Sequence, residues 1–256
     1  MIEQFKKDAE LTLLNSNVIA VPSNTVKENL IKNHVCSPGQ IKILNYYFPF
    51  IDNSDIIRSK MSVRKAFLDK FDIPSNMFYV VSMGTATYRK GFDLFVKVAQ
   101  ELKSYPDIYM IWIGDFIKDE SSTINRDLID KNVVGKNLLI TGFLDHSITN
   151  LLPFDLFLLT SREDPYPLVA IEAAFNRIPI IGFESGGVEE FVGDNCGWII
   201  PEFSTSLMAE KIIELKKEQA HIQQRGENAF QKAIMMHANE NSIISQIKDI
   251  FLKAGL

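Results

Sequence analysis

The sequence predicts an α/β fold whose parallel sheet is doubly wound, that is, covered by helices on both faces. From about residue 76 onward, short apolar runs alternate with segments of helical periodicity. These runs are nearly continuous, which is typical of parallel strands that are buried on both faces. With 256 residues, of which 46% are hydrophobic and 23% charged, the chain is long enough for one large core and a second, small unit.

The strands expected in this sheet follow one another at short intervals. They cover residues 78–83, 109–114, 138–141, 156–160, 178–183 and 198–200. The helices expected between them cover residues 90–104, 123–132, 147–152, 168–177 and 188–192. In doubly wound sheets, ligands bind beyond the carboxyl ends of the strands. At those ends lie polar or glycine-containing segments, namely residues 84–85, 114–115, 142–143 and 161–167.

The two ends of the chain predict smaller parts. The elements expected before the sheet are a strand at 18–22, a helix ending near 32 and capped within Ser23-Asn24-Thr25, a strand at 42–48 and a helix at 63–71. The tail from residue 206 is helical. We therefore expect a short α/β unit at residues 1–75, the sheet domain at 76–235 and a C-terminal helix at 236–256.

Composition and charge exclude several classes of protein. A net charge of −5 argues against a nucleic-acid partner, because such proteins normally carry a basic face. No run approaches the ~18 apolar residues that span a bilayer, and the first residues lack the features of a signal peptide. Cys36 and Cys196 lie far apart, and the four histidines are scattered. We expect a cytoplasmic protein with reduced thiols, no metal site and no transmembrane segment.

The segment at residues 161–174 carries the clearest chemical pattern. A turn with two prolines separates an apolar run from a helix, and carboxylates stand at Asp164 and, eight residues later, at Glu172. Pro167 suits the start of a helix, because its missing N–H would have no partner there. The free amides of Leu168 and Val169 would lie at the positive end of the helix dipole, which attracts phosphate. An acid, a phosphate cradle and a second acid are the layout expected of a nucleotide-sugar site.

This segment resembles the E-x7-E motif of the family-4 (group 1) retaining glycosyltransferases, enzymes of the two-domain GT-B architecture. Asp164 stands where the first glutamate of the motif usually stands, and Glu172 matches the second. Four further segments resemble family motifs in the family's order, at residues 89–93, 113–115, 179–182 and 186–190. The resemblance implies that residues 76–235 are the Rossmann-like, donor-binding C-terminal half of such an enzyme. Residues 1–75 would then be a remnant of the N-terminal domain plus the interdomain linker.

The resemblance also implies a reaction. It is retaining transfer of a sugar from a UDP-, GDP- or ADP-sugar to a glycan or lipid-linked acceptor in polysaccharide biosynthesis, without a metal or other cofactor. The acceptor domain would be a separate N-terminal domain. A full-length enzyme would lie in the cytoplasm or peripherally at the inner membrane face.

The family also assigns roles to single residues. Lys90, together with Arg89 and the amides of Leu168 and Val169, would stabilise the leaving diphosphate. Asp164 would orient the donor sugar, and Glu172 would accept hydrogen bonds from the ribose. The nucleotide-binding residues implied in addition are Gly84, Thr85 and Pro167.

Several alternatives stay open at this point. Arg89 either replaces the arginine that the family commonly has at the position of Thr85 or is a solvated residue at a helix start. Asp164 is also a good turn residue before a helix, with Glu163 as the reserve for its role. The residues for which a structural role is at least as plausible are Asp115, Glu190 and His146. For the whole chain, the alternatives are a non-catalytic nucleotide-sugar binding or interaction module and a sugar-nucleotide epimerase of the same architecture.

Overall fold

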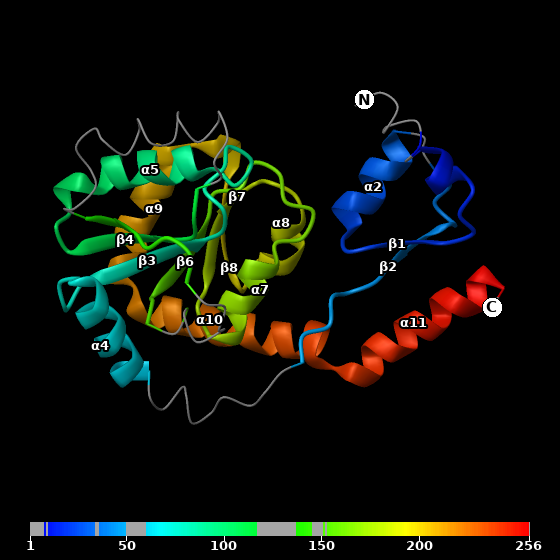
Figure 1. Cartoon of the computed structure of the whole chain (residues 1–256). Helices are drawn as coiled ribbons and strands as arrows, with labels where there is room; N and C mark the ends of the chain where they lie inside the picture. The colour runs from blue at the N-terminus through cyan, green and yellow to red at the C-terminus, as the bar shows by residue number, and fades with distance from the viewer. Residues whose placement is uncertain are drawn as a thin grey trace. The chain divides into compact units, whose positions relative to one another are not determined.

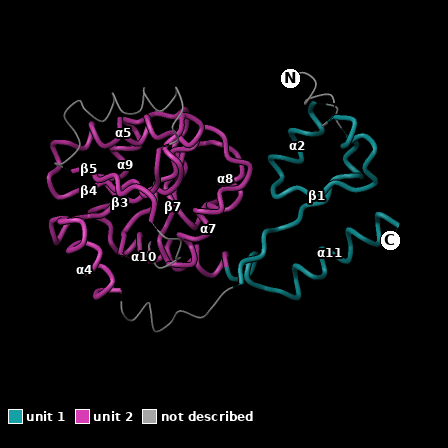
Figure 2. The backbone as a smooth tube through the Cα atoms, in the orientation of Figure 1, with its two compact units in different colours: residues 1–50, 234–256 teal, residues 51–233 magenta. Residues whose placement is uncertain are grey.

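The computed structural model describes residues 8, 10–33, 36–49, 60–116, 137–144, 151 and 153–255. The expected helix at 123–132, nearly all of that at 147–152, and His146 lie outside the described residues. The chain divides into two units, residues 1–50 with 234–256 and residues 51–233 (Figure 2). The expected boundaries lay at 75 and 235. The structure therefore assigns residues 51–75 to the unit that contains the large sheet, and the C-terminal helix to the small one.

The larger unit contains a parallel sheet of six strands (Figure 1). The strands are β3 (Phe78–Met83), β4 (Ile108–Ile113), β5 (Leu138–Ile140), β6 (Leu156–Leu159), β7 (Ile180–Phe183) and β8 (Gly197–Ile200). Their spatial order is β5-β4-β3-β6-β7-β8, and each neighbouring pair is parallel. The first strand, β3, thus lies in the middle of the sheet. Strands β4 and β5 extend the sheet on one side of β3, and β6, β7 and β8 extend it on the other side. This is the strand order of a doubly wound fold, and it confirms the expected fold class.

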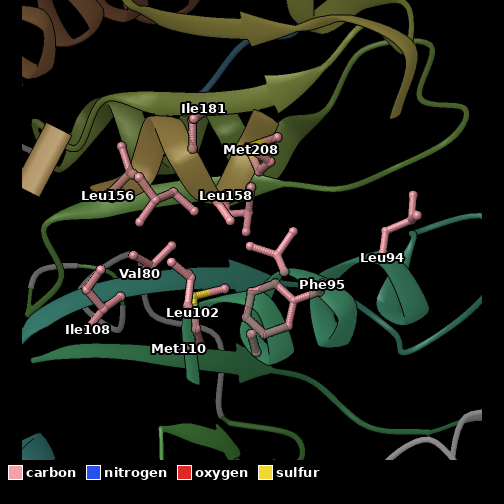
Figure 3. Packing of buried hydrophobic residues seen from close by; sticks show 14 of the residues in the cluster. Val80, Leu94, Phe95, Leu102, Ile108, Met110, Leu156, Leu158, Ile181 and Met208 are labelled. Carbon is pink, nitrogen blue, oxygen red and sulfur yellow. The ribbon is translucent and has the colours of Figure 1, made fainter. Parts of the chain in front are cut away.

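Helices bury both faces of this sheet. On one face, α5 (Phe92–Glu101) and α9 (Thr205–Lys217) pack on alternate residues of the strands. Figure 3 shows this layer, in which Phe95 of α5 and Met208 of α9 lie near Val80, Met110 and Leu158 of the sheet. The other face contacts α7 (Leu168–Phe175) and α10 (Gln219–Ala233). Burial on both sides explains why the strands read as continuous apolar runs rather than as alternating patterns.

The helix α5 begins later than the sequence pattern indicated. It was expected from residue 90, but it begins at Phe92, because Gly91 precedes it in the left-handed conformation with φ of 67°. A left-handed residue cannot continue a helix and is tolerated there because glycine has no Cβ. Arg89 and Lys90 therefore lie on the loop before the helix, not on the helix itself.

Helix α4 (Lys60–Phe71) is fixed to the sheet unit by a partly buried ion pair. Arg64 donates to one oxygen of the Asp155 carboxylate, and the backbone N–H of Tyr79 donates to the other oxygen at 2.9 Å. The Arg64 guanidinium also lies 5.2 Å from the centre of the Tyr79 ring. The side chains of Arg64 and Asp155 are only 22% and 17% exposed, so each would be costly to leave without its partner.

Replacing Asp155 by alanine is expected to lower the free energy of unfolding by about 2–3 kcal/mol. The change leaves the Arg64 charge and the buried N–H of Tyr79 without their acceptor. Asp69→Ala is the matched control, because the Lys65–Asp69 pair on the same helix is 76% and 63% exposed. Asp69→Ala should lower the free energy of unfolding by less than about 0.5 kcal/mol. Urea unfolding measures both, and equal losses in the two variants would contradict the role assigned to Asp155.

The smaller unit is built from both ends of the chain. Strands β1 (Ile19–Val21) and β2 (Ile41–Ile43) form a parallel pair, with α2 (Asn24–Lys32) between them in sequence and α11 (Glu240–Ala254) added from the tail. Ser23 caps α2, as expected, by accepting from the N–H of Val26. We expected a strand at 42–48, but the strand that pairs with β1 ends at Ile43, so it is shorter than expected. Beyond it, the Phe48 N–H donates to the carbonyl of His237, which holds the two ends of the chain together.

Candidate functional site

The two central strands of the sheet mark the place where a ligand would bind. From the neighbouring strands β3 and β6 the chain continues to opposite halves of the sheet, and ligands of doubly wound folds bind at the carboxyl ends of the strands at such a switch point. We call this the β3–β6 crevice. The loop after β3, residues 84–91, and the loop after β6, residues 160–167, form it. Of the residues expected in the site, these loops carry Gly84, Thr85, Arg89, Lys90, Asp164 and Pro167.

The two loops are joined by backbone contacts. The hydroxyl of Thr160 donates to the carbonyl of Lys90 at 3.2 Å, and the N–H of Arg162 donates to the carbonyl of Arg89 at 2.8 Å. A Cβ at position 91 would overlap the carbonyl group of Thr160, so Gly91 allows this approach. The loops therefore behave as one piece at the floor of the crevice.

Lys90 and Asp164, which are 74 residues apart in sequence, meet in an ion pair. The lysine Nζ donates to Oδ2 of Asp164 at 2.6 Å, and the side chains are 22% and 7% exposed. The backbone of Asp164 is held as well, because its N–H donates to Ser185 and its carbonyl accepts from Gly187. Asp164 is thus not the cap of the following helix, whose N-cap position is Pro167 without a side-chain cap bond. Lys90 holds a concentrated positive charge in a sheltered position.

Arg89 and Glu163 lie at the outer rim of the crevice. Arg89 is exposed, and its guanidinium donates to the backbone carbonyl of Glu163 at 3.0 Å. Glu163, the reserve for Asp164, is exposed too, whereas Asp164 is buried against Lys90. Arg89 thus holds a second positive charge close to Lys90, and it is not part of a helix.

A cavity of about 240 Å³ opens beside the two loops. The residues lining it come from the carboxyl ends of β3 and β4, from the segment after β5 and from α7; they are Met83, Gly84, Thr85, Ile113, Gly114, Asp115, Phe143, Leu144, Val169 and Glu172. Four of the residues expected in the site are among them: Gly84, Thr85, Val169 and Glu172. Because ligand pockets commonly enclose ~300–1,000 Å³, this cavity would hold one part of a ligand and the adjoining loops the rest.

Helix α7 connects the cavity to the β3–β6 crevice. It begins at Leu168, directly after Pro167, which has no side chain that could cap it by a hydrogen bond. The Ala170 N–H already donates to the Pro167 carbonyl, whereas helix geometry leaves the amides of Leu168 and Val169 without an intrahelical acceptor, so they and the helix dipole favour an anion at this end. Val169 and the half-buried Glu172 face the cavity one turn apart. A single ligand could thus contact Glu172 and reach the amides and Lys90 with an anionic group.

Sequence reasoning missed part of this arrangement. Leu144 lines the cavity and was not expected there, whereas Phe143, which lies in a segment expected at the strand ends, lines it too and is 60% exposed. The available signal for Leu144 was its position directly after that segment. Asp115, for which a structural role seemed at least as plausible, also lines the cavity. Arg162 of the loop after β6 was not singled out, although it donates to Tyr88 of the other loop and to Asp93 of α5.

The glycine turn at 186–187 contacts the loop after β6 through the hydrogen bond from Gly187 to Asp164. Gly186 has φ of 114° and α8 (Gly187–Val192) begins directly after it, so the chain turns tightly into this helix. Burial and the nearby Glu190 carboxylate raise the pKa of Tyr166, so its phenol stays neutral. Burial is the main cause of the raised pKa of Glu189, and the carboxylates of the neighbouring glutamates raise this pKa further. The Glu190 carbonyl accepts from Lys232, a contact that fastens α8 to α10.

Comparison with known proteins identifies the family. The family model described as glycosyl transferases group 1 matches residues 63–232, which is more than half of the chain. The chain belongs to this family. Among curated proteins, the chain is 27% identical to the O-antigen biosynthesis glycosyltransferase WclY of Escherichia coli over 188 residues, 73% of this chain and 50% of that protein. It thus spans half the length of this curated relative.

Solved structures of GT-B glycosyltransferases share the fold. One is Anabaena HepE in complex with UDP and glucose, with a TM-score of 0.78 and 18% identity over 92% of this chain and 62% of that chain. Another is a glycosyltransferase from Rickettsia africae, with a TM-score of 0.80 and 19% identity over 98% of this chain and 67% of that chain. At these identities the likeness shows the architecture only. It confirms the expected Rossmann-like sheet of a GT-B group 1 glycosyltransferase.

Two negative findings concern the described part of the chain only. No described helix combines the length and apolar character that crossing a bilayer requires. Nor does the described part of the chain bring three or more His, Cys, Asp or Glu residues into an arrangement suited to a metal ion.

Proposed function

We propose that this chain binds the donor of a retaining glycosyl transfer, a nucleoside diphosphate sugar, in the β3–β6 crevice and the cavity beside it. The observation that carries the proposal is that Gly84, which lies beside the Lys90 side chain, lines the same cavity as Val169 and Glu172 of α7. These groups match two parts of such a donor, because cations and amides suit a diphosphate and a carboxylate suits ribose hydroxyls. A solved relative of the same fold, HepE, was crystallised with UDP-glucose.

In the proposed reaction the acceptor oxygen bonds to the anomeric carbon on the face from which the diphosphate leaves. The bond from that carbon to the β-phosphate oxygen breaks, its electron pair stays on the phosphate, and the acceptor proton passes to the phosphate oxygen. Negative charge therefore grows on the diphosphate. In this proposal Lys90, Arg89 and the amides of Leu168 and Val169 stabilise this charge, without a metal or other cofactor.

The ion pair between Lys90 and Asp164 gives both residues a role in this proposal. When the diphosphate binds, Lys90 gains a second anionic partner, and Asp164 is released in part to accept from sugar hydroxyls. Because aspartate is buried here, its position is fixed before the sugar arrives. The acceptor, a glycan or lipid-linked sugar, and a separate acceptor domain remain part of the proposal, as does a cytoplasmic location.

Calorimetric titration with UDP, GDP, ADP and their sugar conjugates, with and without Mg²⁺, tests the proposal. We expect one nucleotide to bind. Failure of all of them to bind to folded protein would contradict donor binding. Binding followed by no transfer to any acceptor, with the acceptor domain supplied, would favour the non-catalytic binding module instead.

Replacing Glu172 by alanine is expected to weaken that nucleotide about 10- to 100-fold, because hydrogen bonds to a charged group contribute about 1.5–3 kcal/mol. Glu210→Ala, an exposed glutamate on α9, is the control and should bind like the wild type. The measurement is the dissociation constant by calorimetry. Unchanged affinity in the Glu172 variant would remove the ribose role from this residue.

A further inference from the structure

Arg162 joins the two loops of the β3–β6 crevice through both its side chain and its backbone. Its guanidinium donates to both oxygens of the Asp93 carboxylate, each at 2.7 Å, and to the carbonyl of Tyr88 at 2.7 Å. The guanidinium also lies 3.7 Å from the centre of the Tyr88 ring. Its backbone N–H donates to the carbonyl of Arg89. A residue of the β6 loop thus contacts the loop after β3 at two successive residues and the first turn of α5.

This arrangement depends on the shape of arginine. Two parallel bonds to one carboxylate require a planar fork, which a lysine ammonium cannot provide. The pair is sheltered, with side-chain exposures of 20% for Arg162 and 14% for Asp93. The hydrogen bond to Asp93 raises the pKa of Arg162, so the guanidinium keeps its charge. Its donors are directed at Asp93 and Tyr88 rather than at the cavity, whose lining does not include Arg162.

The contacts of Arg162 lie on either side of the two cations. Tyr88 precedes Arg89 and Lys90, and Asp93 follows them at the start of α5. Fixing both ends of a short segment restricts the positions that the side chains between them can take. The Lys90–Asp164 pair spans the same two loops, but a bound diphosphate would compete for its lysine. A bound diphosphate would not compete for the donors of Arg162, because these donors are directed at Asp93 and Tyr88. The Arg162–Asp93 pair can therefore hold the loops together with and without ligand.

We propose that Arg162 is a positioning residue, which holds residues 88–93 against the β6 loop so that Lys90 and Arg89 face the diphosphate. This inference rests on the proposed function. It predicts a specific defect: loosening the segment weakens recognition of the phosphates, while the nucleoside part, bound in the cavity, is recognised as before. A residue that served the fold alone would not separate the two parts of the ligand in this way.

The test compares the nucleoside with its diphosphate. Affinities are measured for uridine and UDP, guanosine and GDP, and adenosine and ADP, and the pair that the wild type binds is used for the variants. Arg162→Lys keeps the charge and loses the fork. We expect it to weaken the diphosphate about 10-fold and to change nucleoside affinity less than twofold. Asp93→Asn, which alters the pair from the other side, should show the same pattern.

Arg177→Lys is the matched control. Arg177 also pairs with a carboxylate, Glu227 at 2.8 Å, and lies 3.7 Å from the centre of the Phe230 ring, but these contacts join α10 to the residues after α7. It should lose thermal stability without changing the ratio of nucleoside to diphosphate affinity. Hydrogen exchange of the amides at 88–91 provides a second measure, and these amides should exchange faster in Arg162→Lys and Asp93→Asn but not in Arg177→Lys.

The outcomes separate the two proposals. If the wild type binds a diphosphate and folded Arg162→Lys keeps the wild-type affinity ratio, the positioning role is wrong and donor binding stands. Equal weakening of nucleoside and diphosphate in both Arg162→Lys and Asp93→Asn also overturns the positioning role. If the wild type binds none of the diphosphates, donor binding itself is overturned, and the inference with it.

Discussion

Lys90→Met is expected to lower the rate of donor turnover by about two to three orders of magnitude, the range found when one donor to a developing anion is removed. Methionine keeps most of the aliphatic stem and loses the charge. The charge is effective because the side chain is only 22% exposed, so water screens it little. The measurement is the rate of sugar release from the cognate nucleotide sugar, by transfer or by hydrolysis. Wild-type turnover in folded Lys90→Met would contradict the role.

A control and a double variant separate catalysis from folding in this experiment. Lys97→Met removes an exposed lysine from α5 and should leave turnover unchanged. Lys90→Met also leaves the buried Asp164 carboxylate without its cation, which lowers stability. Adding Asp164→Asn removes the unpaired charge. The double variant should therefore recover stability while its turnover stays low. Recovery of both would show that Lys90 acts only through folding.

Gly91→Ala is expected to destabilise the larger unit by about 2–5 kcal/mol and to abolish measurable diphosphate binding. A side chain at φ of +67° costs roughly 1–2 kcal/mol. In addition, the new Cβ would overlap the carbonyl of Thr160, so the loop that carries Lys90 must move away from the β6 loop. Thermal or urea unfolding measures the first effect, and calorimetry at a temperature where the variant is folded measures the second.

Gly142→Ala isolates the conformational part of that cost. Gly142 has φ of +71°, close to that of Gly91, but among the described residues a Cβ there would meet only the Asp115 carboxylate, at 3.6 Å. This variant should lose only about 1–2 kcal/mol. If both variants lost the same amount, the close approach of Gly91 to Thr160 would not matter to the fold.

The sequence was most informative where the relevant forces are local. The apolar runs locate every strand of the sheet within two residues, because a strand buried on both faces must be apolar along its whole length. Pro167 marks the start of α7 and Ser23 the cap of α2 for equally local reasons. The prediction for α5 missed by two residues, since hydrophobic periodicity does not show that Gly91 is left-handed.

The sequence by itself therefore determined the strands, most of the helices, the family and the segments that carry the candidate site. Only the tertiary structure decided which of those segments meet: Lys90 with Asp164, Arg162 with Asp93, and the chain's tail with residues 1–50. The physical reason is the range of the interactions. Periodicity and turn chemistry act over a few residues, whereas these contacts join residues about 70 or more positions apart. The first two contacts exist because β3 and β6 are neighbours in the sheet, and no local pattern specifies that pairing.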